Sequence, residues 1–340
     1  MARFMRFDKQ WAARLITVIL SLIPILQSSN SQVLVYKKKY VMGTVFEVAA
    51  YSDSLEHTSA AIDEALQEIV RIDDLMSNYK PDSALSNLNR SAHFHTQKVP
   101  IDLYRAIERA VRFSKLSGGK FDITVAPLVN LWKAALAGDS MPTPAQRRQA
   151  QECVGYEKIE LTSPDEVTFH SSCMQLDLGA IGKGYAVDRA GEILQSSGIH
   201  NAFINSGGST ILAMGSPPGQ HGWLVHLCDP SHKIDPYVLL QDQSVSTSEQ
   251  TTRSLLAPDS AGHIIDPSNG APIDTRFAVS VITPLGIPSD GLSTTLLLLG
   301  PKAGKLLVDG MTNISAIWVS PKAEIETATG GTQILFGKKL

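Results

Sequence analysis

A glycine-rich segment around a lysine is the part of the sequence best suited to bind phosphate. It reads DLGAIGKGYAVD, from Asp177 to Asp188, and it places Lys183 between Gly182 and Gly184 just before a predicted helix. Glycines at a helix start let backbone N–H groups approach an anion closely, and the lysine adds positive charge. The spacing is not that of a Walker A loop, because Asp177 stands where that motif has its first glycine. The segment indicates either a phosphate site or a turn with a surface lysine.

A carboxylate and a hydroxyl form a candidate metal site further along the chain. Asp290 and Thr294 lie four residues apart in SDGLSTTLLLLG, residues 289–300. At a helix N-terminus they would share one face and offer two oxygen ligands to one hard cation. The alternative is structural, with Asp290 as a helix N-cap and Thr294 as a core-facing hydroxyl.

Two further polar clusters interrupt apolar patterns. In HIIDPSNGAP, residues 263–272, strand alternation would put His263 and Ile265 on one face. If a hydroxyl must lose its proton near neutral pH, His263 is the best candidate base in the chain, although a lone histidine is often structural. In INSGGS, residues 204–209, a strand runs into a glycine pair, which suits either close approach of a ligand or a tight turn.

The elements predicted around these clusters mix helices and strands without strict alternation. Apolar spacing predicts a helix after the first strand, with Ile62, Leu66, Ile69, Ile72 and Met76 on one face. It also predicts helices at residues 102–118, 185–198 and 292–299. Short β-rich stretches predict strands at residues 41–50, 202–205, 223–228, 278–283 and 314–320. No repeat, low-complexity stretch or long linker interrupts the chain after Ser31. We therefore predict one compact α+β domain with mixed sheets and flanking helices, rather than a doubly wound α/β sheet.

The first 31 residues have the order of a signal peptide. Arg3, Arg6, Lys9 and Arg14 precede an uncharged run at residues 15–26, and small polar residues follow. The run is shorter than the roughly 20 residues that a spanning helix needs, which favours a cleaved signal over an uncleaved anchor. We expect residues 32–340 to form an exported domain.

The charge balance excludes one class of partner, and the cysteines fit an exported chain. Lys and Arg number 30 against 33 Asp and Glu, so the formal net charge is −3 and nothing indicates binding to nucleic acid. Cys153, Cys173 and Cys228 would enter an oxidising compartment, where at most two of them can pair with each other. Without a CxxC motif or clustered His, we expect buried or free thiols rather than metal ligands or a catalytic nucleophile.

In this order, the segments resemble the ApbE family of FAD:protein FMN transferases. The resemblance begins at VMGTVFEV (41–48), continues through MSNYKPDSALSNLN (76–89) and KFDITVAPLVNLW (120–132), and includes the four clusters above. It implies an ApbE-like catalytic domain over residues 32–340. It also implies an enzyme that uses Mg²⁺, takes FMN from FAD, attaches it to a Thr or Ser hydroxyl of an acceptor protein, and releases AMP.

The resemblance implies roles for single residues. Those implied to contact the flavin nucleotide are Met42, Tyr79, Lys120, Phe121, Asp122, Asp177, Lys183 and Ile265. The implied magnesium ligands are the Ala180 carbonyl and the side chains of Asp290 and Thr294, and His263 is the implied base. Phosphoryl-type transfer calls for a hard cation, a clamp on phosphate and a base, and this set supplies all three.

One segment departs from the family pattern. The family usually reads S-T-S-G followed by an aromatic residue, whereas SVSTSEQTTRSLL (244–256) has Glu249 at the glycine and lacks the aromatic. We expect this change to affect the acceptor or adenine side of the site more than the metal.

Two other functions fit the same residues. A magnesium-dependent FAD pyrophosphatase would use water in place of the acceptor hydroxyl. An exported flavin-binding protein without catalysis would need the nucleotide pocket but neither His263 nor the metal pair. For a transferase, the resemblance implies as partner a subunit of an Nqr-like or Rnf-like membrane redox complex. It also implies a periplasmic location, with association to the inner membrane if the leader is retained.

Overall fold

The computed structural model describes residues 32–138, 140–250, 264–328 and 334–337. The predicted signal peptide and His263 lie outside these residues. Among the helices described, none combines the length and the apolar character that crossing a membrane would require.

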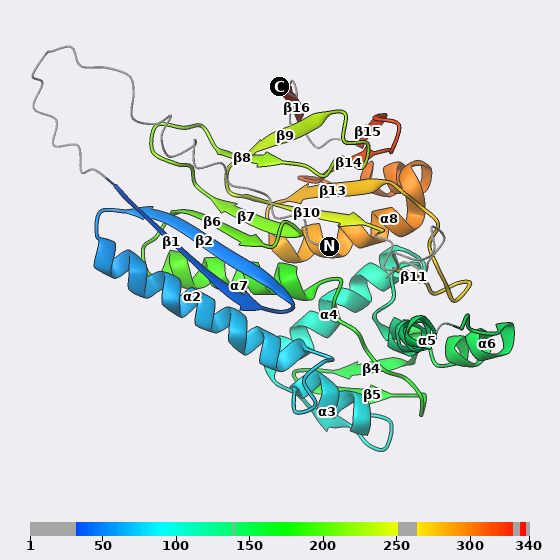
Figure 1. Cartoon of the computed structure of the whole chain (residues 1–340). Helices are drawn as coiled ribbons and strands as arrows, with labels where there is room; N and C mark the ends of the chain where they lie inside the picture. The colour runs from blue at the N-terminus through cyan, green and yellow to red at the C-terminus, as the bar shows by residue number, and fades with distance from the viewer. Residues whose placement is uncertain (1–31, 139, 251–263, 329–333, 338–340) are drawn as a thin grey trace, which may run out of the picture. The chain divides into compact units, whose positions relative to one another are not determined.

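An eight-stranded sheet forms the centre of the described domain (Figure 1). Its order is β1 (Val33–Val41), β2 (Thr44–Ser52), β6 (Asn201–Ser206), β7 (Thr210–Met214), β10 (Gln243–Glu249), β13 (Ala278–Thr283), β14 (Ser315–Val319) and β15 (Ile325–Ala328). Every pair within it is antiparallel. Antiparallel neighbours do not require helical crossovers, which explains why helices and strands do not alternate along the sequence.

Helices cover one face of this sheet. α2 (Leu55–Met76) packs on β1, β2 and α7 (Gly182–Ser196), and α7 packs on α8 (Gly286–Val308), which covers β10 and β13. Alternate residues of β2 point toward the helices, so that Phe46, Val48 and Ala50 are buried in the core they share with α2 and α7. The predicted α+β class is confirmed.

Smaller sheets and helices complete the domain. β8 (Trp223–His226), β9 (Asp235–Leu240) and β16 (Ile334–Gly337) form a three-stranded sheet, and buried residues of β8 and β9 share a core with β7, β10, β13 and β14. β3 (Gln97–Lys98), β5 (Glu166–Phe169) and β4 (Ile159–Thr162) form another, and β11 (Ile265–Asp266) pairs with β12 (Ala271–Pro272). The remaining helices are α3 (Ala84–Ser91), α4 (Ile101–Leu116), η1 (Ile123–Val125), α5 (Ala126–Ala137), α6 (Pro144–Glu152) and η2 (Tyr156–Lys158).

α2 shows how the apolar pattern determines the packing. The residues predicted to share one face, Ile62, Leu66, Ile69, Ile72 and Met76, are all buried. The Ser54 side chain accepts a hydrogen bond from the backbone of His57 at 3.3 Å and caps the helix N-terminus. Each fully buried apolar side chain of this size contributes roughly 1.5–3 kcal/mol.

Two helices begin earlier than their apolar patterns indicate. α7 begins at Gly182 rather than near Tyr185, and α8 begins at Gly286 rather than at Leu292. In both cases the first turn is polar or glycine-rich, yet it is buried against the other helix, so no apolar period marks it. α8 also continues beyond its predicted end, with a break at Gly300, whose φ of 71° is readily available only to glycine.

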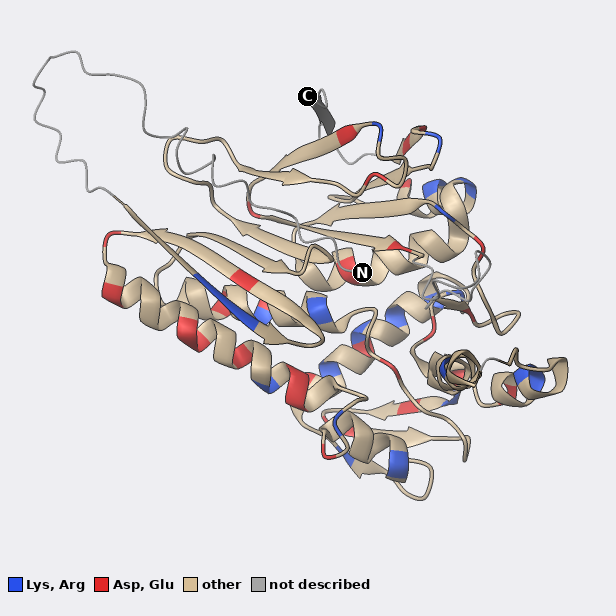
Figure 2. Ribbon diagram, in the orientation of Figure 1, with Lys and Arg blue, Asp and Glu red and all other residues tan. Residues whose placement is uncertain are grey.

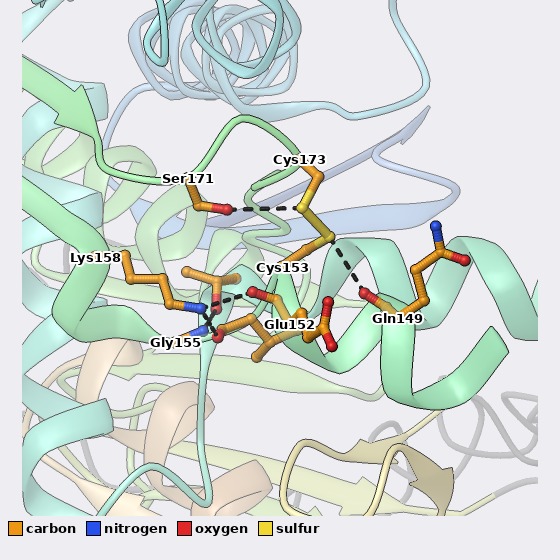
Figure 3. Close-up of a disulfide and its surroundings, with 9 residues drawn as sticks. Gln149, Glu152, Cys153, Gly155, Lys158, Ser171 and Cys173 are labelled. Carbon is orange, nitrogen blue, oxygen red and sulfur yellow. Dashed lines mark hydrogen bonds between the residues drawn. A yellow bond between two sulfur atoms is a disulfide. The ribbon is translucent and has the colours of Figure 1, made fainter. Parts of the chain in front are cut away.

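Two of the three cysteines are paired, an outcome that the sequence had left open by allowing at most two of them to pair with each other. Cys153 at the end of α6 forms a disulfide with Cys173, 20 residues further on (Figure 3). Cys173 lies between β5 and Asp177, so the bond ties α6 to the segment that leads into the glycine-rich loop. Nothing in the sequence near either residue distinguished this pair from the alternatives. Cys228 is free.

Candidate active site

A cavity of about 530 Å³ gathers most of the residues predicted to bind nucleotide or metal. The predicted residues that line it are Tyr79, Lys120, Phe121, Asp122, Asp177, Ala180, Lys183, Ile265, Asp290 and Thr294. Met42 lies outside the lining, and its Cε is 3.4 Å from the point where a Cβ on Gly182 would stand. A volume of this size is typical of a site for a small molecule or cofactor.

The N-termini of α7 and α8 meet at this cavity through two glycines. A Cβ added at Gly184 would stand 2.3 Å from the Gly286 carbonyl oxygen, and one added at Gly286 would stand 2.6 Å from the Gly184 carbonyl oxygen. Only hydrogen fits at either position. This contact explains why two segments about a hundred residues apart in the chain can share one site.

Two carboxylates cross-link the same helix starts. Asp290 of α8 accepts a hydrogen bond from the Gly184 N–H at 2.8 Å. Asp188 of α7 accepts hydrogen bonds from the Gly286 and Ile287 N–H groups, at 2.5 and 2.9 Å, and so satisfies the first turn of α8. Burial raises the pKa of Asp188 to about 6, against the opposing effect of these two N–H groups.

The Asp290 carboxylate is enclosed, with 3% of the residue exposed. Besides the Gly184 N–H, its Oδ1 accepts a hydrogen bond from the Ser246 hydroxyl at 3.2 Å. Burial raises the pKa of Asp290, and Lys183 together with these hydrogen bonds opposes that effect. The alternative that Asp290 is the N-cap of its helix is not what the structure shows, because α8 begins four residues earlier, at Gly286.

Thr294 lies one turn after Asp290 and shares a hydrogen bond of 3.1 Å with the Ser248 hydroxyl. The Ala180 carbonyl belongs to the loop before α7, and Ala180 lines the same cavity. Carboxylate, hydroxyl and carbonyl oxygens are the ligand types that Mg²⁺ prefers. Within the described residues no group of three or more His, Cys, Asp or Glu could hold a metal. The donor set therefore fits an ion that retains water or substrate oxygens, as Mg²⁺ does.

The loop before α7 has the geometry of an anion site. The Asp177 side chain accepts a hydrogen bond from the Gly179 N–H at 2.7 Å and so shapes the turn. α7 then begins at Gly182 without a side-chain N-cap, and Lys183 lies in its first turn. The positive end of the helix dipole and the lysine ammonium favour negative charge at the same place.

An exposed tyrosine lies at another part of the cavity wall. Tyr79 is 79% exposed, and its hydroxyl accepts a hydrogen bond from the Lys133 ammonium at 2.9 Å. The same nitrogen is 4.8 Å from the centre of the ring. Lys133 therefore holds the ring through its hydroxyl and over one face, and the exposed remainder of the ring is available for stacking.

The segment around Phe121 has structural partners as well as cavity contact. The Asp122 carboxylate accepts hydrogen bonds from Thr124 and from the Tyr156 N–H, and thereby caps η1. Phe121 is buried in the main core. Lys120 forms an ion pair with Asp266 at 2.7 Å, which lowers the pKa of Asp266 although burial opposes the shift.

Several residues at this site were not among the predicted site residues, although the sequence had marked residues 244–256 as a departure from the family pattern. Ser246 and Ser248 of β10 contact the candidate metal ligands, and Lys133 contacts Tyr79. Glu249 lines the cavity and accepts a hydrogen bond from the Cys228 thiol at 3.1 Å. Burial and the adjacent carboxylate raise the pKa of Cys228, which keeps this thiol protonated. Lys133 belongs to no motif, so a single sequence gave no signal for its contact with Tyr79.

The glycine pair after β6 also reaches the cavity. Gly207 and Gly208 both have positive φ, 63° and 79°, and they line it together with Ser209. A Cβ on Gly207 would stand 1.9 Å from the Thr44 hydroxyl of β2. The tight-turn and ligand-approach alternatives for this segment are therefore compatible.

Comparisons with known proteins agree with these features. The model of the ApbE family matches residues 42–318. The FAD:protein FMN transferase of Haemophilus influenzae is 30% identical over 279 residues, which covers 76% of this chain and 79% of the relative. That of Treponema pallidum is 28% identical over 318 residues, 86% of each chain.

Solved structures show the same fold. The flavin transferase ApbE from Vibrio cholerae superposes with a TM-score of 0.75 at 25% identity, covering 87% of this chain and 96% of its own. The ApbE protein of Thermotoga maritima has a TM-score of 0.76 at 25% identity, covering 86% of this chain and 96% of its own.

Proposed function

The chain belongs to the ApbE family and is a transferase, and from that premise we propose that it takes FMN from FAD and attaches it to a Thr or Ser of an exported acceptor protein. One observation carries the proposal. The Asp290 carboxylate accepts a hydrogen bond from the Gly184 N–H at 2.8 Å. This bond brings the candidate metal ligands of α8 next to the glycine-rich loop before α7, which is the candidate phosphate site.

The chain's own residues supply most of what the reaction needs. Lys183 and the start of α7 would hold the pyrophosphate of FAD, and Tyr79 would stack on an aromatic ring of the nucleotide. The Ala180 carbonyl, Asp290 and Thr294 would hold Mg²⁺, which when bound neutralises charge on phosphate oxygens. His263, which lies outside the described residues, would accept the proton of the acceptor hydroxyl. AMP leaves as FMN joins the acceptor oxygen.

Location and partner complete the proposal. The charged start and the apolar run at residues 15–26 support export, and a periplasmic enzyme could reach membrane redox complexes of the Nqr or Rnf type. Lys and Arg are spread over many elements rather than gathered on one (Figure 2). This spread supports the expectation that nucleic acid is not a partner of this protein.

A labelling experiment tests this function. The purified protein is incubated with FAD, Mg²⁺ and a periplasmic extract, and flavin-bearing proteins are identified by mass spectrometry. We expect a Thr or Ser peptide carrying FMN, with an equal amount of AMP. AMP and free FMN without any labelled protein would show FAD hydrolysis instead, and no AMP would show binding without catalysis.

An Asp290→Asn variant tests the metal site. It removes the formal charge of the donor set and keeps the size of the side chain. We expect normal folding, loss of most transfer at low magnesium and partial recovery at high magnesium. Asp309→Asn, an exposed position at the end of the same helix, is the matched control. Equal loss at every magnesium concentration, together with a collapse of thermal stability, would make Asp290 a structural residue.

A further inference from the structure

β1 is an edge strand of the sheet, unpaired on its outer side within the described residues. It is the first strand of the eight-stranded sheet, and no other described strand pairs with its outer edge. Its turn to β2, Met42-Gly43, has φ values of 52° and 72°, as in a two-residue hairpin that pairs Val41 with Thr44. Alternate residues from Val41 backward therefore bond to β2. The residues between them direct their N–H and C=O groups outward.

The four outward residues of β1 also share one exposed face. Leu34, Tyr36 and Tyr40 are 49%, 50% and 74% exposed, and Lys38 is exposed as well. Val35 and Val41 point the other way into the core. Natural edge strands are usually shortened, bulged, covered or lined with charged side chains such as lysine, because free backbone groups invite pairing. This one presents nine regular residues with large side chains beside those groups.

The edge carries uncompensated positive charge. Three lysines follow one another at residues 37–39, visible as the blue stretch of β1 in Figure 2. Lys37 forms an ion pair with Asp63 at 2.6 Å. Lys38 and Lys39 form none with any other described residue, and the one acidic residue opposite Lys38, Glu47, accepts hydrogen bonds from Tyr36 and Asn205. The edge therefore favours an acidic partner.

The C-terminal end of β1 reaches the candidate active site. Met42, in the turn after β1, touches the start of α7, where a Cβ on Gly182 would be 3.4 Å from its Cε. Thr44, on the other side of the turn, contacts Gly207, which lines the cavity. A segment paired with β1 would span seven residues, about 20 Å, from Leu34 to Tyr40 and would end at the cavity rim.

We propose that the outer edge of β1 binds the acceptor protein as an added strand, with an acidic, extended segment beside the Thr or Ser that receives FMN. The inference rests on the proposed transferase function and names how its acceptor is held. Backbone hydrogen bonds to the outward groups provide affinity, Lys38 and Lys39 select for acidic segments, and Tyr36 and Tyr40 pack on its side chains.

A proline substitution isolates the backbone contribution. Lys38→Pro removes an N–H that points away from β2 and leaves the β1–β2 hydrogen bonds in place, as prolines of natural edge strands do. Lys38→Ala removes the same side chain and keeps the N–H, so it is the matched control. The acceptor is the protein labelled in the experiment above, and transfer is measured against its concentration.

We expect Lys38→Pro to raise the KM for the acceptor about tenfold above that of Lys38→Ala. The KM for FAD and the release of AMP without acceptor should stay unchanged. Reversing both charges, Lys38→Glu with Lys39→Glu, should also raise the acceptor KM, and added salt should reduce the difference from wild type.

Other outcomes count against the proposal in separate ways. Equal acceptor KM values for the proline and alanine variants would overturn docking on β1 while leaving the transferase function intact. A wild-type protein that labels no acceptor would overturn the function and the docking together. A wild-type dimer that Lys38→Pro dissociates, seen by light scattering, would assign the edge to a second copy of this chain instead.

Discussion

The contact between Gly184 and Gly286 allows a sharp prediction for Gly184→Ala. The new Cβ would lie 2.3 Å from the Gly286 carbonyl oxygen and 2.8 Å from the Asp290 Cβ. Carbon and oxygen atoms that are not bonded rest at roughly 3.5 Å, so the helix starts must separate by about 1 Å. Neither obstacle is the flexible end of a long side chain, because one belongs to the backbone and the other to the root of a buried side chain.

The cost has two parts. Overpacking of a close helix contact costs about 1–3 kcal/mol. A shift of about 1 Å also stretches the 2.8 Å bond from the Gly184 N–H to Asp290 beyond hydrogen-bond length, and a bond to a charged group contributes about 1.5–3 kcal/mol. Together we expect about 3–6 kcal/mol of destabilisation, which lowers the Tm by about 5–12 °C in a domain of this size.

Calorimetry and transfer assays measure the two consequences separately. Under the proposed function, Gly184→Ala should also need more magnesium for half-maximal transfer, because Asp290 moves. Gly310→Ala is the matched control, since nothing lies within 4 Å of its added Cβ and its φ is not positive. A Gly184→Ala protein that melts like the control and transfers FMN like wild type would refute the close contact.

Three further predictions concern other parts of the structure. The pKa of Asp188 is raised to about 6, so its contribution to stability is complete below its ordinary pKa of 3.8 and is lost as pH rises through 6. In urea unfolding, the stability of wild type should therefore fall by about 3 kcal/mol relative to that of Asp188→Asn between pH 4 and 7. A difference that stays constant over this range would contradict the raised pKa. Lys133→Met and Tyr79→Phe should each weaken FAD binding several-fold in calorimetry, because each removes the same hydrogen bond between Lys133 and Tyr79. The double variant should therefore bind FAD no more weakly than either single variant, and additive losses would show that Lys133 acts independently. Replacing Cys153 and Cys173 by serine should cost about 3 kcal/mol, as should reduction of wild type, and reduction should leave the double variant unchanged.

The sequence predicted the elements whose packing is apolar and local. α2 was predictable because Ile62, Ile69 and Met76 repeat at the helical period, and that stripe is what the sheet buries. β13 matches its predicted bounds because Val279, Val281 and Ile282 are apolar and β-branched. In such segments each residue carries its own signal, whatever its neighbours in space are.

β10 could not be predicted in the same way. Its helix-facing residues are Ser244, Ser246 and Ser248, and they are paired with polar side chains of α8, including Ser289 and Asp290. A buried serine is stable only when it has a hydrogen-bond partner, and here the partners in α8 lie more than forty residues away. The buried face of β10 is therefore polar, and its sequence pattern is typical of a loop rather than of a strand.

The candidate site shows the same division. The residues of its motifs were predicted, and the structure brings most of them to one cavity, but their roles toward FAD and Mg²⁺ stay predictions. The residues that hold them, such as Lys133 beside Tyr79, had no motif to reveal them. The Cys153–Cys173 pair was also beyond prediction, because pairing depends on a distance that only the fold determines.

The bonds between the starts of α7 and α8 make the pocket one of the last parts of the molecule to assemble during synthesis. A ribosome produces the chain from its N-terminus, and 98 residues separate Asp188 from its partner Gly286. Until α8 emerges, the glycine-rich loop lacks Asp290 and the cavity lacks one wall. A growing chain therefore has an incomplete cavity, which closes only when α8, in the last third of the chain, has folded onto α7.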